Sequence, residues 1–196
     1  MSTITWPTGV VPDTFALRLY TNQVVNSAPF GGSEQVVDRL NDRWAITMSL
    51  PKRTRAQAGA VEAFCNAMRG MTNTVNLYHF GRKVPLGTMR GAPLCQAAAQ
   101  GASQIVISGL LGDTLKAGDM IATGGMLLQV AEDVTANGSG FLTTKIVNRL
   151  RGAIVSGAPV AWDRPATPFR LMSSPAVTHA PGYADSVSLD FLEVLL

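Results

Sequence analysis

The sequence predicts a mainly β fold that contains one α-helix. Several segments alternate apolar and polar residues with a period of two, which is typical of half-buried strands. One segment instead carries its apolar residues at the spacing of an amphipathic helix. Short strand-like runs separated by glycine-rich turns fill the middle of the chain, and this pattern favours a small barrel or sandwich.

The first elements are expected from residue 14 onward. Every second residue of 14–20 is apolar, which predicts a strand. Residues 26–32 read NSAPFGG, a composition that is typical of a loop. A short strand is expected over 35–39, followed by a turn at Asn41 and Asp42.

The clearest strand is expected over residues 44–50, with Pro51 ending it. A helix follows over about 54–69, where Thr54 and Gln57 have the spacing of a capping box. Its apolar stripe consists of Ala58, Val61, Phe64, Cys65 and Met68. Gly70 is a natural residue to end this helix, and TVNLYHF after it predicts a further strand over 74–80.

The composition changes after this strand. Residues 91–103 are small and almost uncharged, which indicates a connector. About five short strands are expected over 104–162, with a hairpin at Gly124 and Gly125 and a turn over 137–140. These strands predict a small β-barrel-like or sandwich module.

The end of the chain returns to longer elements. A strand is expected over 167–172 and a loop over 175–182. Residues 186–191 alternate again, and the strand is expected to run almost to Leu196; so apolar a strand should be paired because a free edge would aggregate.

The simplest topology has an inserted module. Residues 1–89 and 164–196 would then form one β domain from both ends of the chain, and residues 90–163 would form the inserted small β-barrel or sandwich. No internal repeat is visible in the sequence.

Charge and composition exclude several classes of protein. Charged residues make up 15% of the 196 residues, and the net charge is +3. Basic residues are mixed along the chain, with no basic stripe and aromatic platform of the kind that binds nucleic acids. No apolar run is long enough to span a membrane, and we expect no signal peptide. A lightly charged surface suits a subunit that is covered by its neighbours.

No catalytic, metal or cofactor site is expected. The motifs of common hydrolases, metalloproteases and nucleotide-binding proteins are absent from the sequence. His79 and His179 are expected to pack or to lie on the surface, and Cys65 to be a buried thiol. Asp119, in the phrase LKAGDMI, is expected to make a tight turn, and Asp133 is likewise expected to belong to a turn.

Aromatic residues offer one alternative function. A sugar-binding platform could use Trp6 or Tyr183. Trp44 is expected in the core because it continues an apolar strand face, and Trp162 is expected at the boundary between the two parts of the chain.

The order of several phrases resembles a known family. SAPFGGSEQVV, DRWAITMSLP, RAQAGAVEAFCNAMRG and TVNLYHFG run in the order found in distal-tail-type minor tail proteins of long-tailed bacteriophages and prophages. The similarity continues through GTMRGAPLCQ, LKAGDMIATGG and PFRLMSS to the final SVSLDFLEVL, so it covers nearly the whole chain.

This resemblance implies a structural virion protein without enzymatic activity. Family members form a ring, usually a homohexamer, at the distal end of the tail tube, and they join the tube to the baseplate or tail-tip hub. The implied fold is a tube-type β-sandwich domain with an inserted small barrel. The implied location is the phage tail tip, after synthesis in the cytoplasm of the host bacterium. Partners would be other copies of the chain, the tube protein and the hub.

The loop at residues 26–34 is the expected oligomer contact. Phe30, Gly31 and Gly32 lie in it, and Phe30 has no obvious place in a core covered by a helix. We therefore expect Phe30 to pack against an adjacent subunit. The alternative function is that of a β module that binds a carbohydrate or another component of the host surface. A third function, hydrolysis of the cell wall, is disfavoured because the sequence shows no ordered pair of acidic residues.

Overall fold

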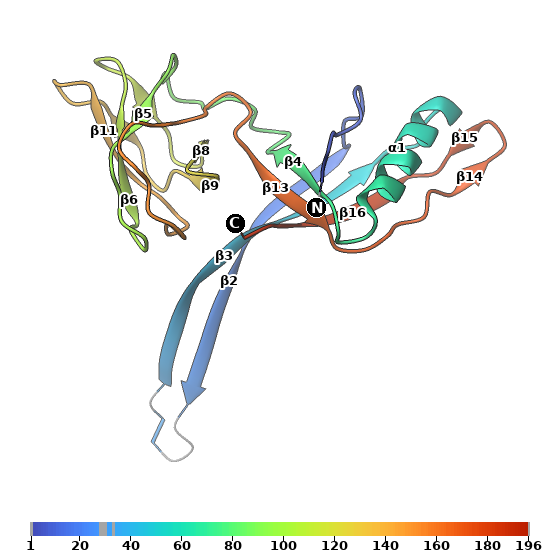
Figure 1. Cartoon of the computed structure of the whole chain (residues 1–196), viewed down its shortest axis with the longest axis horizontal. Helices are drawn as coiled ribbons and strands as arrows, with labels where there is room; N and C mark the ends of the chain where they lie inside the picture. The colour runs from blue at the N-terminus through green and yellow to red at the C-terminus, as the bar shows by residue number, and fades with distance from the viewer. Residues whose placement is uncertain (1, 28–30, 33, 196) are drawn as a thin grey trace.

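The computed structural model describes residues 2–27, 31–32 and 34–195. Within these residues the fold is mainly β with a single helix, which confirms the predicted fold class. Figure 1 shows a central sheet, a group of short strands on one side of it, a helix on the other, and a long two-stranded arm that points away from all of them.

Both ends of the chain build the largest sheet. Its six strands run in the order β1-β4-β13-β16-β3-β2. They are β1 (Thr3–Ile4), β2 (Thr14–Ser27), β3 (Glu34–Leu50), β4 (Thr74–Tyr78), β13 (Ala166–Leu171) and β16 (Val187–Glu193). All neighbours are antiparallel except β1 and β4. The C-terminal strand β16 is paired on both sides, by β13 and β3, as its apolar sequence predicts.

One face of this sheet is covered. Trp44, Ile46, Met48 and Leu50 alternate along β3 and are buried, as predicted. Helix α1 (Arg55–Met68) packs its predicted apolar stripe into the same cluster. The expected capping box does not form: the Thr54 hydroxyl caps no backbone N–H and instead donates to the Gln57 side-chain oxygen at 3.4 Å. The helix ends at Arg69, whose φ of 50° is left-handed, directly before Gly70.

The chain between β4 and β13 forms the short strands. They are β5 (Leu94–Cys95), β6 (Gln104–Ser108), β7 (Thr114–Leu115), β8 (Met120–Thr123), β9 (Met126–Gln129), β10 (Val134–Thr135), β11 (Phe141–Lys145) and β12 (Ala158–Pro159). Four of them form the sheet β11-β6-β5-β12. We call this region the β module; it has its own buried cluster, which includes Ile105, Ile107, Leu128 and Leu142.

Two details of the β module bear on the predictions. The expected hairpin at Gly124 and Gly125 joins β8 and β9, and both glycines have the positive φ that such a tight turn requires. The expected connector at 91–103 is partly wrong, because β5 lies inside it and pairs with β6 and β12. Only Leu94–Cys95 of this segment form a strand, and most of its other residues are exposed.

A segment between β13 and β16 crosses the helix. It contains the short hairpin of β14 (His179–Ala180) and β15 (Tyr183–Ala184), where a loop was expected. Backbone hydrogen bonds tie Arg53, before the helix, to Ala184. This hairpin lies beside α1 in Figure 1.

Candidate assembly interface

The two-stranded arm is the most exposed regular structure in the described chain. It is made by residues 22–27 of β2 and 34–39 of β3, which pair with each other. We call these two segments the arm. The register shifts between Tyr20 and Asn22, where β3 carries extra residues, and the arm leaves the sheet at this bulge.

The expected loop at 26–32 and the expected turn at Asn41 and Asp42 are therefore wrong in part. β2 continues to Ser27, and β3 runs without a break from Glu34 to Leu50. The valine pairs explain the continuation, since β-branched side chains favour extended backbone. Asn41 and Asp42 lie in the bulge, so their turn chemistry bends a strand and does not end it.

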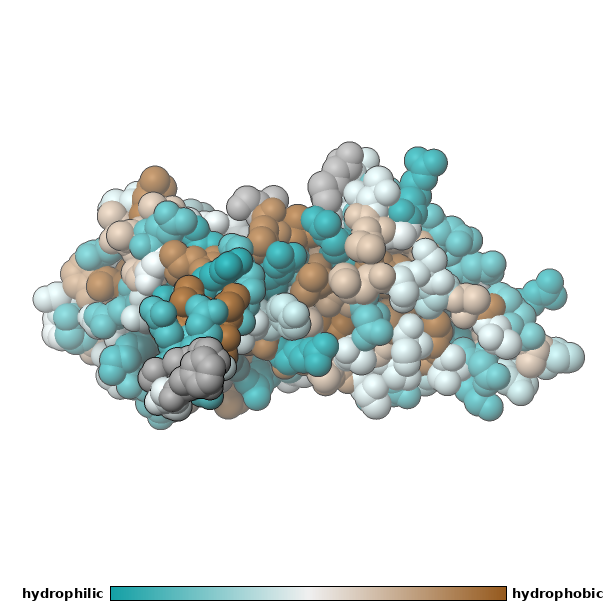
Figure 2. Space-filling model, turned by 90° about the horizontal axis from the view of Figure 1, so that it is seen from below, coloured by the Kyte–Doolittle hydropathy of each residue, from teal (hydrophilic) through white to brown (hydrophobic). Residues whose placement is uncertain are grey.

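Four valines of the arm expose large parts of their side chains on both faces. Val24 lies opposite Val37, and Val25 opposite Val36. Consecutive residues of a strand point to opposite faces, so each face carries one valine pair. Their exposed fractions are 36% for Val24, 39% for Val37, 56% for Val25 and 55% for Val36. Figure 2, which looks toward the tip of the arm, shows apolar side chains among hydrophilic ones around it.

Two of the three predicted contact residues, Gly31 and Gly32, lie at the end of this arm. Gly31 and Gly32 are exposed between β2 and β3. Gly32 has a φ of 61°, in the left-handed region that favours glycine. A Cβ atom placed on Gly32 would meet no atom of the described chain within 4 Å. Phe30 lies outside the described residues, so its contact with an adjacent subunit stays a prediction. The sequence signal that reveals the arm itself is the pair of Val-Val dipeptides on either side of this loop.

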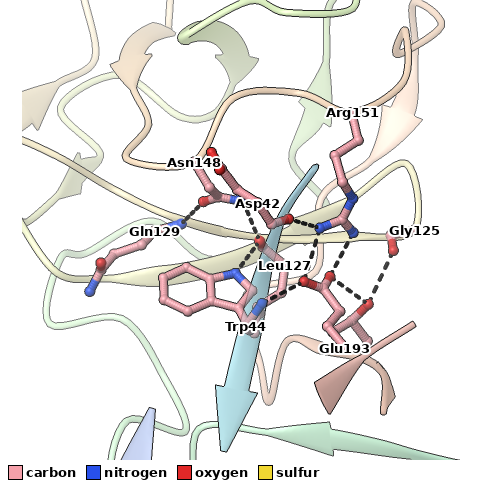
Figure 3. Close-up of polar contacts among 9 residues, drawn as sticks. Asp42, Trp44, Gly125, Leu127, Gln129, Asn148, Arg151 and Glu193 are labelled. Atoms are coloured by element: carbon pink, nitrogen blue, oxygen red, sulfur yellow. Dashed lines mark hydrogen bonds and ion pairs between the residues drawn. The ribbon is translucent and has the colours of Figure 1, made fainter. Parts of the chain in front are cut away.

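A network of buried polar groups lies where the arm leaves the sheet (Figure 3). Glu193 of β16 is fully buried, and Arg151 of the β module donates two hydrogen bonds to its carboxylate, at 2.6 and 2.9 Å. The backbone N–H of Trp44 donates to the same carboxylate at 2.9 Å. The hydroxyl of Thr167 lies within hydrogen-bond distance of both Glu193 and the Gly125 carbonyl. The network therefore joins the sheet to the β module.

Asp42 lies at the edge of this network and is almost fully buried. Its backbone carbonyl accepts from Arg151, but its carboxylate Oδ1 has no hydrogen-bond partner among the described residues. Burial raises the pKa of Asp42 above its usual range; Asp38 adds to the rise, while Arg149 and Arg151 oppose it. Burial of an ionised carboxylate costs free energy, so this position favours a protonated Asp42 more than water does.

In the described chain, neither histidine bonds to this network. His79 is half-buried against the ring of Phe15, with ring centroids 4.8 Å apart. Burial lowers its pKa, and Arg82 lowers it further. His179 lies 3.2 Å from the Glu62 carboxylate on α1, at the surface. Both positions agree with the packing and surface roles that the sequence indicates.

The other candidate residues have structural contacts. Cys65 and Cys95 are buried, and burial raises the pKa of each thiol. Asp119 is buried, and its carboxylate accepts a backbone hydrogen bond from Lys116 within the predicted turn. It also accepts backbone hydrogen bonds from Leu86 and Gly87, in a segment more than thirty residues earlier in the chain.

Asp133 also has a structural contact, at the surface. It accepts from the Lys116 ammonium and from the Ala117 N–H, and these contacts lower its pKa. The carboxylate thus fixes the turn before β8.

The aromatic residues fall into two groups. Trp6 packs among Phe64, Phe80 and Phe191, so its faces are not available as a sugar platform. Trp44 is 2% exposed, as predicted for a core residue, and its indole N–H donates to the Leu127 carbonyl at 2.8 Å.

Tyr183 is partly exposed, and Trp162 is half-buried. Tyr183 is 42% exposed, and the Lys52 ammonium lies 5.1 Å from its ring centroid. Trp162 donates from its indole N–H to the Gly91 carbonyl, and the Arg90 guanidinium lies 5.0 Å from its ring centroid.

Within residues 2–27, 31–32 and 34–195, no three His, Cys, Asp or Glu side chains gather closely enough to hold a metal ion. The described helix is too short and too polar to cross a membrane. Comparison with protein-family models and with curated proteins finds no match for this chain.

Proposed function

We propose that this chain is a structural virion protein at the distal end of a phage tail tube. It would assemble through its arm into a ring, which in the family that the sequence resembles is usually a homohexamer. The ring would join the tube to the baseplate or tail-tip hub. The tube-type β-sandwich and the location at the tail tip rest on the resemblance of the sequence to minor tail proteins. The exposed valines of the arm are the observation that carries the assembly part of the proposal.

An exposed arm needs a partner for physical reasons. A two-stranded ribbon without a hydrophobic cover is only marginally stable in water. Here each face carries a valine pair, so a partner that covered only one face would leave the other pair in water. Burial of both faces between neighbouring copies would stabilise the arm and the assembly together.

The long edge of β2 supports the same proposal. In the described chain β2 pairs with β3 on one side and has no strand on the other. A free edge of this length is a template for another strand. A contact between different surfaces of successive copies generates a ring when the rotation closes.

Mass and shape in solution test the assembly part of this proposal. The purified chain is studied by sedimentation velocity over a concentration series, and its particles are imaged by negative-stain electron microscopy. The proposal predicts closed rings of uniform size in equilibrium with smaller species. A chain that stays monomeric at the highest concentrations would contradict it. Phe30→Ala should weaken the rings without changing the melting temperature.

The alternative function, carbohydrate or host-surface binding, has one specific observation in its favour. Tyr183 is partly exposed at a hollow that Arg55, Glu62 and His179 also line. A glycan array probed with the isolated protein distinguishes the two functions. Specific glycan binding that Tyr183→Ala abolishes would favour the alternative.

A further inference from the structure

The arm leaves the large sheet at an unusual hydrogen bond. The ladder between β3 and β16 ends at the pair Ala45 and Leu192. At the next position the Trp44 N–H does not bond to a strand carbonyl but to the side-chain carboxylate of Glu193. The carboxylate thus takes the place of a ladder carbonyl at the point where β3 diverges from β16.

One loop of the β module holds this point of departure. Arg151 binds both oxygens of the Glu193 carboxylate, and the same guanidinium donates to the Asp42 carbonyl at 2.9 Å. Two residues earlier in the chain, Arg149 forms an ion pair with Asp38 on the arm. The loop 148–151 therefore contacts β3 at successive positions along the root of the arm.

The loop itself is fixed within the β module. Leu150 is fully buried, and its backbone bonds to Gly101 and Ala102 at 2.8 and 3.0 Å. The Asn148 amide donates to the Leu127 carbonyl at 2.9 Å and accepts from the Gln129 N–H at 3.3 Å. In Figure 3 the Leu127 carbonyl accepts from both the Asn148 amide and the Trp44 indole.

We propose that loop 148–151 is a brace that sets the direction of the arm, so that the β module positions the arm for assembly. Beyond the bulge, β2 and β3 pair only with each other among the described strands, since the ladder with β16 has already ended, and Arg149 of this loop forms an ion pair with Asp38 of the arm. The charged groups that face the brace are Asp38 and Asp42 from β3 and Glu193 from β16. The role in assembly rests on the proposed function, whereas the fixed direction of the arm is a property of the single chain.

The direction of the arm is measured by pulsed electron spin resonance on the full chain. Spin labels are placed at two exposed positions by Gln23→Cys on the arm and Ala63→Cys on α1. The original chain, which lacks the two introduced cysteines, is treated with the same label and shows any background labelling of buried Cys65 and Cys95. The unaltered brace should give one narrow distance distribution, because the arm is held at its root.

Two variants remove parts of the brace. Arg149→Ala deletes a half-buried ion pair without disturbing the buried carboxylate. Arg151→Lys keeps the charge next to Glu193 but cannot make three hydrogen bonds in the planar geometry of a guanidinium. Lys145→Ala is the matched control, since it deletes an exposed ion pair with Glu132 that lies elsewhere in the β module.

Both brace variants should lose the single narrow distance distribution, and the control should keep it. Narrow distributions centred on the original distance in the brace variants would overturn the proposal. If Arg151→Lys does not fold, Arg149→Ala decides alone. If the distance distribution broadens in the brace variants but rings form as before, loop 148–151 does set the direction of the arm. In that case the role of the arm in assembly, and with it that part of the proposed function, is wrong.

Discussion

The sharpest prediction concerns the four valines of the arm. We replace Val24, Val25, Val36 and Val37 together by threonine. Threonine keeps the β-branch that favours an extended backbone, so the arm itself should persist. Its hydroxyl costs free energy when it is buried without a partner, so the contact that covers the arm should weaken.

The size of the effect follows from the exposed fractions. Together the four valines expose nearly as much side chain as two whole valines. Full burial of a valine is worth about 1.5 kcal/mol, so the cover is worth about 3 kcal/mol for each arm. A loss of this size corresponds to about a 100-fold higher Kd for the contact.

Sedimentation velocity over a concentration series measures this change, and thermal unfolding of the dilute protein shows whether the monomer is intact. The matched control is Val155→Thr, because Val155 is 74% exposed in the β module and lies outside the arm. The control should assemble as the original chain does. If the quadruple variant also assembles with an unchanged Kd, the valines do not form the contact and the reasoning from exposure fails.

Three further predictions concern the core and the network. Ile46→Asp places an unpaired carboxylate at a position that is 1% exposed, and it should abolish soluble folding. Unchanged thermal unfolding would show that the Ile46 side chain does not face the core. Arg151→Met leaves Glu193 buried without its partner, and it should lower the free energy of unfolding by about 3–5 kcal/mol in a urea titration; a loss of less than about 1 kcal/mol would mean that water reaches the carboxylate. His79→Gln tests pH dependence. Since the folded state lowers the pKa of His79 below 6.5, its contribution to stability is present above that pH and is lost as the pH falls toward the folded pKa. The melting temperature of the original chain should therefore decline more steeply than that of the variant on acidification, and parallel curves would refute the assignment.

The sequence predicts those strands and helices that bury one face and expose the other. The strand with Trp44 and Ile46 and the helix with Val61 and Phe64 stand out because burial on one face produces a clear period. The hairpin at Gly124 is equally clear, because two successive positive φ angles are available mainly to glycine.

The expected strand over 35–39 is confirmed as part of β3, but the other half of the arm escapes this reasoning for a physical reason. Val24 and Val25 lie side by side and point to opposite faces, so residues 22–27 show no alternation. Alternation marks a strand with one buried face, whereas the arm has two exposed faces in the single chain. Under the proposed function, neighbouring copies cover both faces.

The network at the root of the arm is also invisible in the sequence. Glu193 and Trp44 are 149 positions apart, and Arg151 comes from a third segment. No local pattern brings such residues together, because their contact depends on the relative position of the sheet and the β module. The expected capping box at Thr54 shows the reverse error, since the spacing is present but the Thr54 hydroxyl bonds to the Gln57 side chain and caps no backbone N–H.

Location in the particle tests the central claim most directly. Antibodies raised against the purified chain, coupled to gold, are applied to phage particles released by the bacterium that encodes it. The account predicts gold at the distal end of the tail tube, and no gold along the tube or at the head. Particles that carry no label, or that are labelled along the whole tube, would contradict it.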